Sequence, residues 1–186
     1  MSFYLVFIQT VAILAIVALV AGSALLLGHL SGGGRDLLRR RFAGQGVELI
    51  GWAAGVALVA MAGSLYLSDG VGFTPCLLCW YQRIAMYPLV VICGVGALTR
   101  DVKSWRYGVP LAAIGLLVAL YHVALQFQPA LDVVSCDVGA PCTGRYVLVF
   151  GFISIPTLAG SAFLLILGLL LTARTVASHD DGGVAA

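Results

Sequence analysis

The sequence has few charged residues, which make up only 10% of its 186 residues. A soluble domain of this size carries roughly a quarter charged residues, so this composition excludes a soluble globular fold. Hydrophobic residues account for 61% of the chain, and the mean hydropathy is +1.06. The sequence therefore predicts an integral membrane protein, and its length limits it to a small bundle of helices with short loops.

The excess of positive charge is also small, at +2, and it gives no indication of nucleic-acid binding because the cations are clustered by loop. The clusters are Arg35, Arg39, Arg40 and Arg41 in one loop, Arg100, Lys103 and Arg106 in another, and Arg174 at the start of the tail. The positive-inside rule predicts this pattern for cytoplasmic loops.

Five apolar runs are long enough to cross a bilayer, for which about 20 residues are needed. The runs cover about residues 3–30, 47–67, 76–99, 107–127 and 146–173, with Pro156 inside the last one. No charge precedes the apolar core of the first run, which argues against a cleavable signal peptide. With the basic loops in the cytoplasm, the N-terminus lies outside and both cysteine-bearing segments face the outer side.

Two cysteines at C-x-x-C spacing, Cys76 and Cys79, open the third run. Pro75 precedes them, and proline is typical of the first turn of a helix. The pair would then lie at a helix N-terminus, where the helix dipole favours a thiolate. Arg83 lies on the same face and one turn deeper. A cation at membrane depth is costly and usually functional, although a long arginine side chain can also extend to the outer interface.

A second pair, Cys136 and Cys142, falls in the loop of residues 128–145 on the same predicted side of the membrane. The four cysteines could form two structural disulfides, a tetrahedral zinc site or two redox pairs that exchange disulfides. A disulfide across two intervening residues adds little stability because the closed loop is short, and C-x-x-C at a helix start is typical of exchange chemistry. We favour the redox interpretation, and the other two stay open.

The fifth cysteine, Cys93, lies roughly 21 Å deeper than Cys79 in a straight helix with a rise of 1.5 Å per residue. This separation excludes a disulfide between the two. A buried free cysteine usually behaves as a small hydrophobic residue. We therefore expect Cys93 to have a packing role.

The sequence contains no haem-binding or flavin-binding pattern, so electrons from an outer dithiol need another acceptor. A membrane-soluble quinone is the simplest acceptor. A zinc tetrathiolate or a structural disulfide has no need of a cation one turn below the cysteines. An acceptor that becomes anionic on reduction does, which gives Arg83 a role in the redox interpretation.

The stretch Cys76–Pro88, CLLCWYQRIAMYP, resembles the signature of the DsbB family of disulfide-bond-forming membrane oxidoreductases, and it is most similar to the short BdbC-like branch. The second half of the chain carries further matching motifs, which are Tyr121-His122-x-x-x-Gln126, Ser135-Cys136, Pro141-Cys142 and Ser154-Ile155-Pro156-Thr157. The resemblance covers about residues 47–173.

This resemblance implies a four-helix bundle in a bacterial or archaeal cell membrane, with both cysteine pairs on the extracytoplasmic side. Such proteins reoxidise a thioredoxin-fold thiol oxidase of the DsbA or BdbD type and pass the electrons to ubiquinone or menaquinone. By position, Cys136 and Cys142 would form the pair that meets the partner's dithiol. Cys76 and Cys79 would form the pair beside the quinone, and no metal ion is expected.

Individual roles also follow from the resemblance. Cys79 would contact the quinone ring, and Arg83 would polarise or neutralise the reduced ring. His122 falls where the family often has a histidine near the quinone site, although a histidine near a helix end can simply bond to a neighbour.

The chain departs from the family in its first apolar run, because the family core has four helices. We divide the chain into an additional N-terminal transmembrane helix (1–30), a basic cytoplasmic loop (31–46), the four-helix bundle (47–173) and a disordered cytoplasmic tail (174–186). We expect the additional helix to be an accessory segment with no part in the chemistry.

Two other classes of protein remain as alternatives. One is a quinone-linked thiol oxidoreductase of the vitamin K epoxide reductase type, in which the loop pair usually comes before the C-x-x-C pair, opposite to the order here. The other is a non-enzymatic membrane scaffold held together by zinc or by disulfides.

Overall fold

The computed structural model describes residues 2–132, 140–145 and 147–183. Within these ranges the chain is helical, and five helices are long and apolar enough to cross a membrane, which confirms the predicted all-α, five-span fold. The long helices are α1 (Ser2–Leu30), α3 (Gly46–Leu65), α4 (Leu77–Leu98), α5 (Trp105–Phe127) and α6 (Ile155–Gly183). The short ones are α2 (Gly32–Arg41), the π-helix η1 (Tyr66–Gly70) and the 3₁₀-helices η2 (Val102–Ser104) and η3 (Pro129–Leu131).

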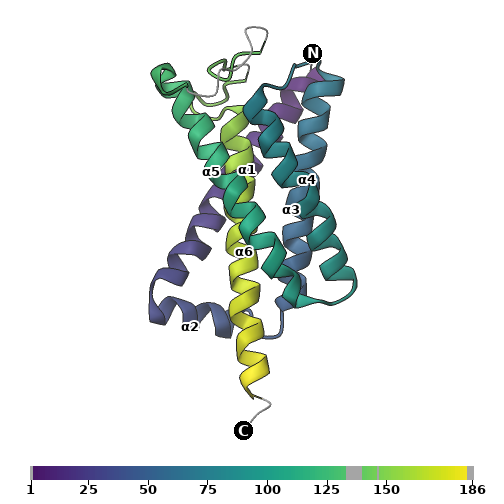
Figure 1. Cartoon of the computed structure of the whole chain (residues 1–186), viewed down its shortest axis with the longest axis vertical. Helices are drawn as coiled ribbons and strands as arrows, with labels where there is room; N and C mark the ends of the chain where they lie inside the picture. The colour runs from purple at the N-terminus through teal and green to yellow at the C-terminus, as the bar shows by residue number, and fades with distance from the viewer. Residues whose placement is uncertain (1, 133–139, 146, 184–186) are drawn as a thin grey trace.

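Helix α6 is the central element of the bundle, as Figure 1 shows, and it packs against α1, α3 and α5. Its side chains at Phe163, Ile166 and Leu170 are fully buried. These positions are three and four residues apart, so they form one helical stripe that faces the core. On α5, Gly115 has no side chain, which leaves room for the Phe163 ring to lie against that helix.

Helix α1 packs closely against α6 rather than lying apart from the bundle. Its buried positions Ile8, Ala12 and Ala15 form one stripe. Further along, a Cβ atom at Gly22 would come within 2.8 Å of the backbone nitrogen of Leu165. In a membrane, helices associate through such close packing of small residues, because lipid supplies no hydrophobic driving force between them.

The segment 31–46, expected as a loop, contains the helix α2. Ser31 caps this helix, since its Oγ accepts a hydrogen bond of 3.1 Å from the backbone N–H of Gly34. Leu38 is the buried residue of α2 and lies next to Gly28 at the end of α1. This contact of Leu38 attaches the basic segment to the end of the bundle.

The bounds of the fifth span also differ from the expected 146–173. Helix α6 begins at Ile155, after a tight turn in which Val149 and Ile153 form an isolated β-bridge and Gly151 adopts a φ of +79°. Pro156 therefore lies in the first helical turn, where its missing N–H has no helical partner to lose.

Helix α6 also continues to Gly183, so the described part of the tail is helical rather than disordered. Two contacts explain this extension. Val176 is buried, and the Arg174 guanidinium lies 4.9 Å from the centre of the Trp105 ring.

The cationic segments gather at one end of the bundle. In Figure 1, α2, the connection between α4 and α5, and the C-terminus lie at the lower end. The start of α4, where the C-x-x-C pair lies, is at the upper end. The basic segments and the C-x-x-C pair thus lie at opposite ends of the bundle. That the basic end faces the cytoplasm stays a prediction from the positive-inside rule.

The fold predicts that Gly115→Leu destabilises the bundle. The added side chain would overlap the Phe163 ring, and overpacking of this kind costs about 1–3 kcal/mol. The measurement is the thermal unfolding midpoint in detergent. Gly94→Leu is the matched control, because no atom lies within 4 Å of a Cβ at Gly94. Equal midpoints for the two variants would contradict this description of the core.

Candidate functional site

The first cysteine of the C-x-x-C pair caps helix α4. Cys76 has an extended backbone, and its Sγ accepts a hydrogen bond of 3.4 Å from the backbone N–H of Cys79. The predicted position of the pair at a helix N-terminus is therefore confirmed. The expectation for Pro75 was wrong, because Pro75 precedes the cap and lies outside the first helical turn.

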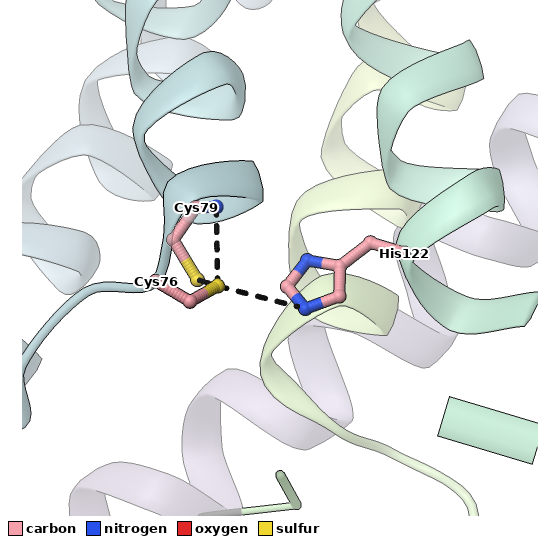
Figure 2. A group of neighbouring side chains, drawn as sticks. All are labelled: Cys76, Cys79 and His122. Atoms are coloured by element: carbon pink, nitrogen blue, oxygen red, sulfur yellow. Dashed lines mark hydrogen bonds between the residues drawn. The ribbon is translucent and has the colours of Figure 1, made fainter. Parts of the chain in front are cut away.

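Both cysteines of this pair are free thiols, and their sulfur atoms lie 2.8 Å apart. Figure 2 shows that His122, on α5, points across the gap toward them. Its Nε2 lies 3.7 Å from the Sγ of Cys76. A disulfide has an S–S length of about 2 Å, so only a small movement separates the two sulfur atoms from the bonding distance that oxidation of the pair requires.

The imidazole of His122 is buried, with 2% of its surface exposed, and it is held on both nitrogens. Nδ1 accepts a hydrogen bond of 3.2 Å from the Nε2 amide of Gln82. An amide nitrogen only donates, so the ring proton of the neutral imidazole lies on Nε2. Nε2 donates to the backbone oxygen of Cys142 over 3.1 Å and also faces the Cys76 sulfur.

These contacts lower the pKa of the Cys76 thiol below its usual value. The main cause is the hydrogen bond from the Cys79 thiol, and hydrogen bonding and charge at His122 act in the same direction. Burial opposes the shift, because a low-dielectric environment disfavours a thiolate. In the reduced pair, the thiolate is therefore favoured at Cys76.

Helix α5 also holds the loop that carries the second cysteine pair. Gln126, one turn beyond His122, donates from Nε2 to the backbone oxygen of Gly144 over 3.3 Å. Arg145 donates from Nη2 to the backbone oxygen of Gln126 over 2.6 Å. These bonds explain the Tyr121-His122-x-x-x-Gln126 motif as an anchor for the loop.

Cys142 is buried and disulfide-bonded. It belongs to one buried cluster with Cys76, against which Cys79 also packs. The structure thus brings one member of the second pair beside the first pair. Cys136 lies outside the described residues, so its pairing with Cys142 stays a prediction.

Arg83 is fixed between α3 and α4 by hydrogen bonds. Its Nε donates to the Oγ of Ser64, and its Nη2 donates to the backbone oxygen of Ser64, each over 2.9 Å. Its guanidinium also lies 5.2 Å from the centre of the Trp80 ring. The cation is therefore held by α3 within the bundle, rather than extended freely to the outer interface.

A cavity of about 500 Å³ adjoins all of these groups. Its polar end is lined by Cys76, Cys79, Gln82, Arg83, Tyr87 and His122, and the rest of its wall is mostly apolar. A cavity of about 150 Å³ is enough to hold a benzene ring. The space is therefore large enough for a ring-shaped ligand in contact with the cysteine pair and the arginine.

Three of the groups at this site were not assigned a role from the sequence. Gln82 and Ser64 hold His122 and Arg83, and the Tyr87 hydroxyl is buried without a hydrogen-bond partner beside the cavity. Their polarity alone could have marked them as candidates, because polar side chains inside a transmembrane helix are usually functional. Their partners lie on other helices, so the specific contacts could not be read from spacing.

The arrangement also bears on the metal alternative. The ligand atoms of Cys76, Cys79 and His122 all lie within 4.8 Å of one another, which is close enough for three of them to bind one ion. A site of four thiolates is not formed by the described cysteines, because Cys142 is in a disulfide.

The remaining cysteine, Cys93, lies away from this site. It is a fully buried free thiol in the main core and lies next to Gly108 of α5. This position agrees with the expected packing role.

Comparison with known proteins supports the sequence motifs. A family model described as "Disulfide bond formation protein DsbB" matches residues 47–173. "Disulfide bond formation protein C" of Bacillus subtilis (strain 168) is 48% identical over 113 residues, which cover 60% of this chain and 82% of the relative. "Probable disulfide formation protein C" of Halalkalibacterium halodurans is 49% identical over 111 residues, which cover 59% and 81%. No solved structure matches significantly.

The site predicts that His122→Leu raises the pKa of the Cys76 thiol. A hydrogen bond to a charged group contributes about 1.5–3 kcal/mol, which corresponds to roughly one pH unit or more. A thiolate exists above its pKa, so the variant should hold less thiolate near neutral pH. The measurement is thiolate absorbance against pH in reduced protein whose three other cysteines, Cys93, Cys136 and Cys142, are replaced by alanine.

The control for this titration is His29→Leu, because His29 bonds to Thr172 far from the cysteines. We expect that change to leave the titration midpoint where it is in the parent. An unchanged midpoint in His122→Leu would show that His122 does not stabilise the Cys76 thiolate.

Proposed function

Because the chain belongs to the DsbB family of disulfide bond formation proteins, we propose that this multi-pass membrane oxidoreductase passes electrons from a partner dithiol to a quinone. The observation that carries the proposal is the cavity beside the C-x-x-C pair. Its polar end combines two thiols with a fixed cation, and its remaining wall is apolar. This combination suits a ring that dissolves in lipid and becomes anionic on reduction.

The net reaction converts a partner dithiol and a quinone into a partner disulfide and a quinol, with transfer of two electrons and two protons. The partner is a thioredoxin-fold thiol oxidase of the DsbA or BdbD type outside the cytoplasm. Its thiolate attacks the Cys136–Cys142 disulfide at Cys136 and forms a mixed disulfide. The second partner thiol then attacks that bond, so the partner leaves oxidised and Cys136 and Cys142 are left as thiols.

The second exchange transfers the oxidising equivalent between the two cysteine pairs of this chain. One thiolate of the loop pair attacks the Cys76–Cys79 disulfide, and a second attack leaves the loop pair oxidised and the C-x-x-C pair reduced. The burial of Cys142 and Cys76 in one cluster supports this step, because Cys142 already lies beside the C-x-x-C pair.

The last step re-forms the Cys76–Cys79 disulfide, whose sulfur atoms already lie 2.8 Å apart. The Cys76 thiolate would attack the Cys79 sulfur, and the S–H bond of Cys79 would break as its proton and two electrons pass to the quinone. A second proton, from solvent, would complete the quinol. The fixed guanidinium of Arg83 stabilises negative charge on the reduced ring oxygen, as a preorganised cation does in a site that excludes water. The Cys79 thiol and His122 both favour the thiolate form of Cys76.

The proposed orientation places both cysteine pairs outside the cytoplasm. The support is the charge distribution, since the cations of residues 35–41 and 100–106 lie at the opposite end from the start of α4. The positive-inside rule assigns that basic end to the cytoplasm.

A second candidate is a zinc-binding scaffold, which the cluster of Cys76, Cys79 and His122 favours. Structural zinc sites have four ligands, so a fourth ligand would have to join these three. Metal analysis of the purified protein separates the two candidates. Stoichiometric zinc together with no reduction of any quinone would favour the scaffold.

The proposal predicts that Cys79→Ser lowers quinone reduction by at least about 100-fold, because serine cannot form the disulfide. The measurement is loss of quinone absorbance when purified protein receives a quinone and a reduced thioredoxin-fold dithiol protein. Cys93→Ser is the matched control and should retain activity within about twofold. Quinone reduction by Cys79→Ser at the wild-type rate would refute this electron path.

Arg83→Gln tests the role of the cation, because it retains a polar side chain that can donate a hydrogen bond and removes the charge. We expect kcat/KM for the quinone to fall by about 100-fold, the usual loss for a group that stabilises developing negative charge. Disulfide exchange between the partner and the loop pair should change by less than about twofold, because Arg83 bonds to Ser64 rather than to that loop. A parallel loss in both reactions would instead indicate structural damage.

A further inference from the structure

We propose that helix α1, which lies outside the family match, forms one wall of a lateral groove that receives the polyprenyl tail of the quinone. The inference rests on the proposed function and names the part of the substrate that this additional helix recognises. Its support is the course of the cavity, which extends from the cysteine pair along α1.

Two adjacent stripes on α1 have different neighbours. The stripe of Ile8, Ala12 and Ala15, continued by Gly22, is buried, and Gly22 lies against the backbone of α6. The neighbouring stripe of Phe7, Val11, Leu14 and Ala18 lines the cavity, and Ala15 and Val17 on either side of it also reach the cavity wall. The members of this second stripe are four, three and four residues apart, so they share one helix face. The helix therefore docks with one face and presents the next face to the cavity.

The groove lies between α1 and α3. Near the cysteine end, Phe7 of α1 contacts Tyr66 of η1, which directly follows α3, and their ring centres are 4.4 Å apart. A Cβ atom at Gly63 of α3 would also lie 3.9 Å from the Phe7 ring. Figure 1 shows that α1 and α3 diverge toward the lower end, where α1 leads into α2. The residues that line the cavity continue along both helices below the aromatic contact, from Val11 to Ala18 on α1 and from Ala60 to Trp52 on α3.

The cavity reaches well beyond the space that one ring needs. Along α3 its lining extends from Ser64, which holds Arg83, to Trp52. Ser64 lies twelve positions after Trp52, which corresponds to roughly 18 Å along the helix. Gly55 lies on this wall, and no atom lies within 4 Å of a Cβ at that position. A quinone ring at Arg83 would thus leave a long apolar space below it.

The continuity of this space with the redox groups identifies its occupant. Its polar end, at Cys79 and Arg83, is where the proposed function places the ring, and its apolar walls begin directly below. A polyprenyl quinone has the same division into one polar ring and one apolar chain. A membrane phospholipid would have to place its headgroup at the membrane surface, away from the part of the groove that Arg83 and Ser64 enclose.

The first test compares two quinones with the same ring, one without a tail and one with four isoprene units. Leu14→Trp should raise the KM for the tailed quinone at least tenfold, because the indole fills the groove. It should leave kcat/KM for the tail-less quinone within twofold. Each quinone is compared with itself across variants, so differences in detergent partitioning cancel.

Ile13→Trp is the matched control, because Ile13 neighbours Leu14, is similarly exposed and does not line the cavity. Both quinones should behave with this variant as with the wild type. The proposal is overturned if Leu14→Trp and Ile13→Trp have the same effect on the tailed quinone. It is also overturned if Leu14→Trp affects both quinones equally, which is the result expected when a phospholipid chain occupies the groove.

A second variant, on the α3 wall of the groove, keeps the proposal testable if Leu14→Trp does not fold. Gly55→Leu adds a side chain to open space in the groove, and Gly94→Leu adds the same side chain to open space outside it. Only Gly55→Leu should raise the KM for the tailed quinone. If the wild type reduces neither quinone, the proposed function itself fails. If it reduces both and neither groove variant is selective, only the role of α1 is refuted.

Discussion

The site depends on one buried imidazole that joins separate parts of the chain. His122 on α5 binds Gln82 of α4 through Nδ1, and its Nε2 faces both Cys76 and the backbone of Cys142. Each of these bonds is made where water is excluded, so leaving any partner unsatisfied would be costly. The same ring therefore ties α4, α5 and the backbone at Cys142 together, and it helps the Cys79 thiol to lower the pKa of the first cysteine.

The position of the cation follows from a similar constraint. An arginine inside a membrane protein must satisfy its donors within the bundle, and Ser64 accepts two of the bonds from Arg83. These two hydrogen bonds fix the position of the Arg83 guanidinium beside the cavity. They do not neutralise its charge, because neither the serine hydroxyl nor the backbone oxygen carries a negative charge. Cys76, which caps the N-terminus of α4, and Arg83, about two turns deeper, thus place a thiolate and a cation at two levels beside one cavity, as the proposed dithiol-to-quinone reaction requires.

Much of this arrangement could be predicted from the sequence. Hydropathy predicted five spans, and the C-x-x-C spacing with Arg83 predicted that these residues share a helix face, because both signals are local. The start of α6 could not be predicted this way, since the apolar residues 147–153 form a turn before Pro156. The pairs Gln82–His122 and Arg83–Ser64 join different helices. Only tertiary packing decides such pairs, so spacing along the chain carries no information about them.

The additional helix α1 lies beside the candidate site because of the way it packs against the bundle. Because lipid does not drive apolar helices together, α1 is held by the close approach of Gly22 and Gly168 to the facing helix. This contact involves α6 and leaves the adjacent face of α1, with Val11, Leu14 and Ala18, to line the cavity. At the outer end the same face is held by Phe7, whose ring contacts Tyr66. Close packing of glycines on one side of α1 therefore positions larger apolar side chains along the cavity that opens at Cys79 and Arg83.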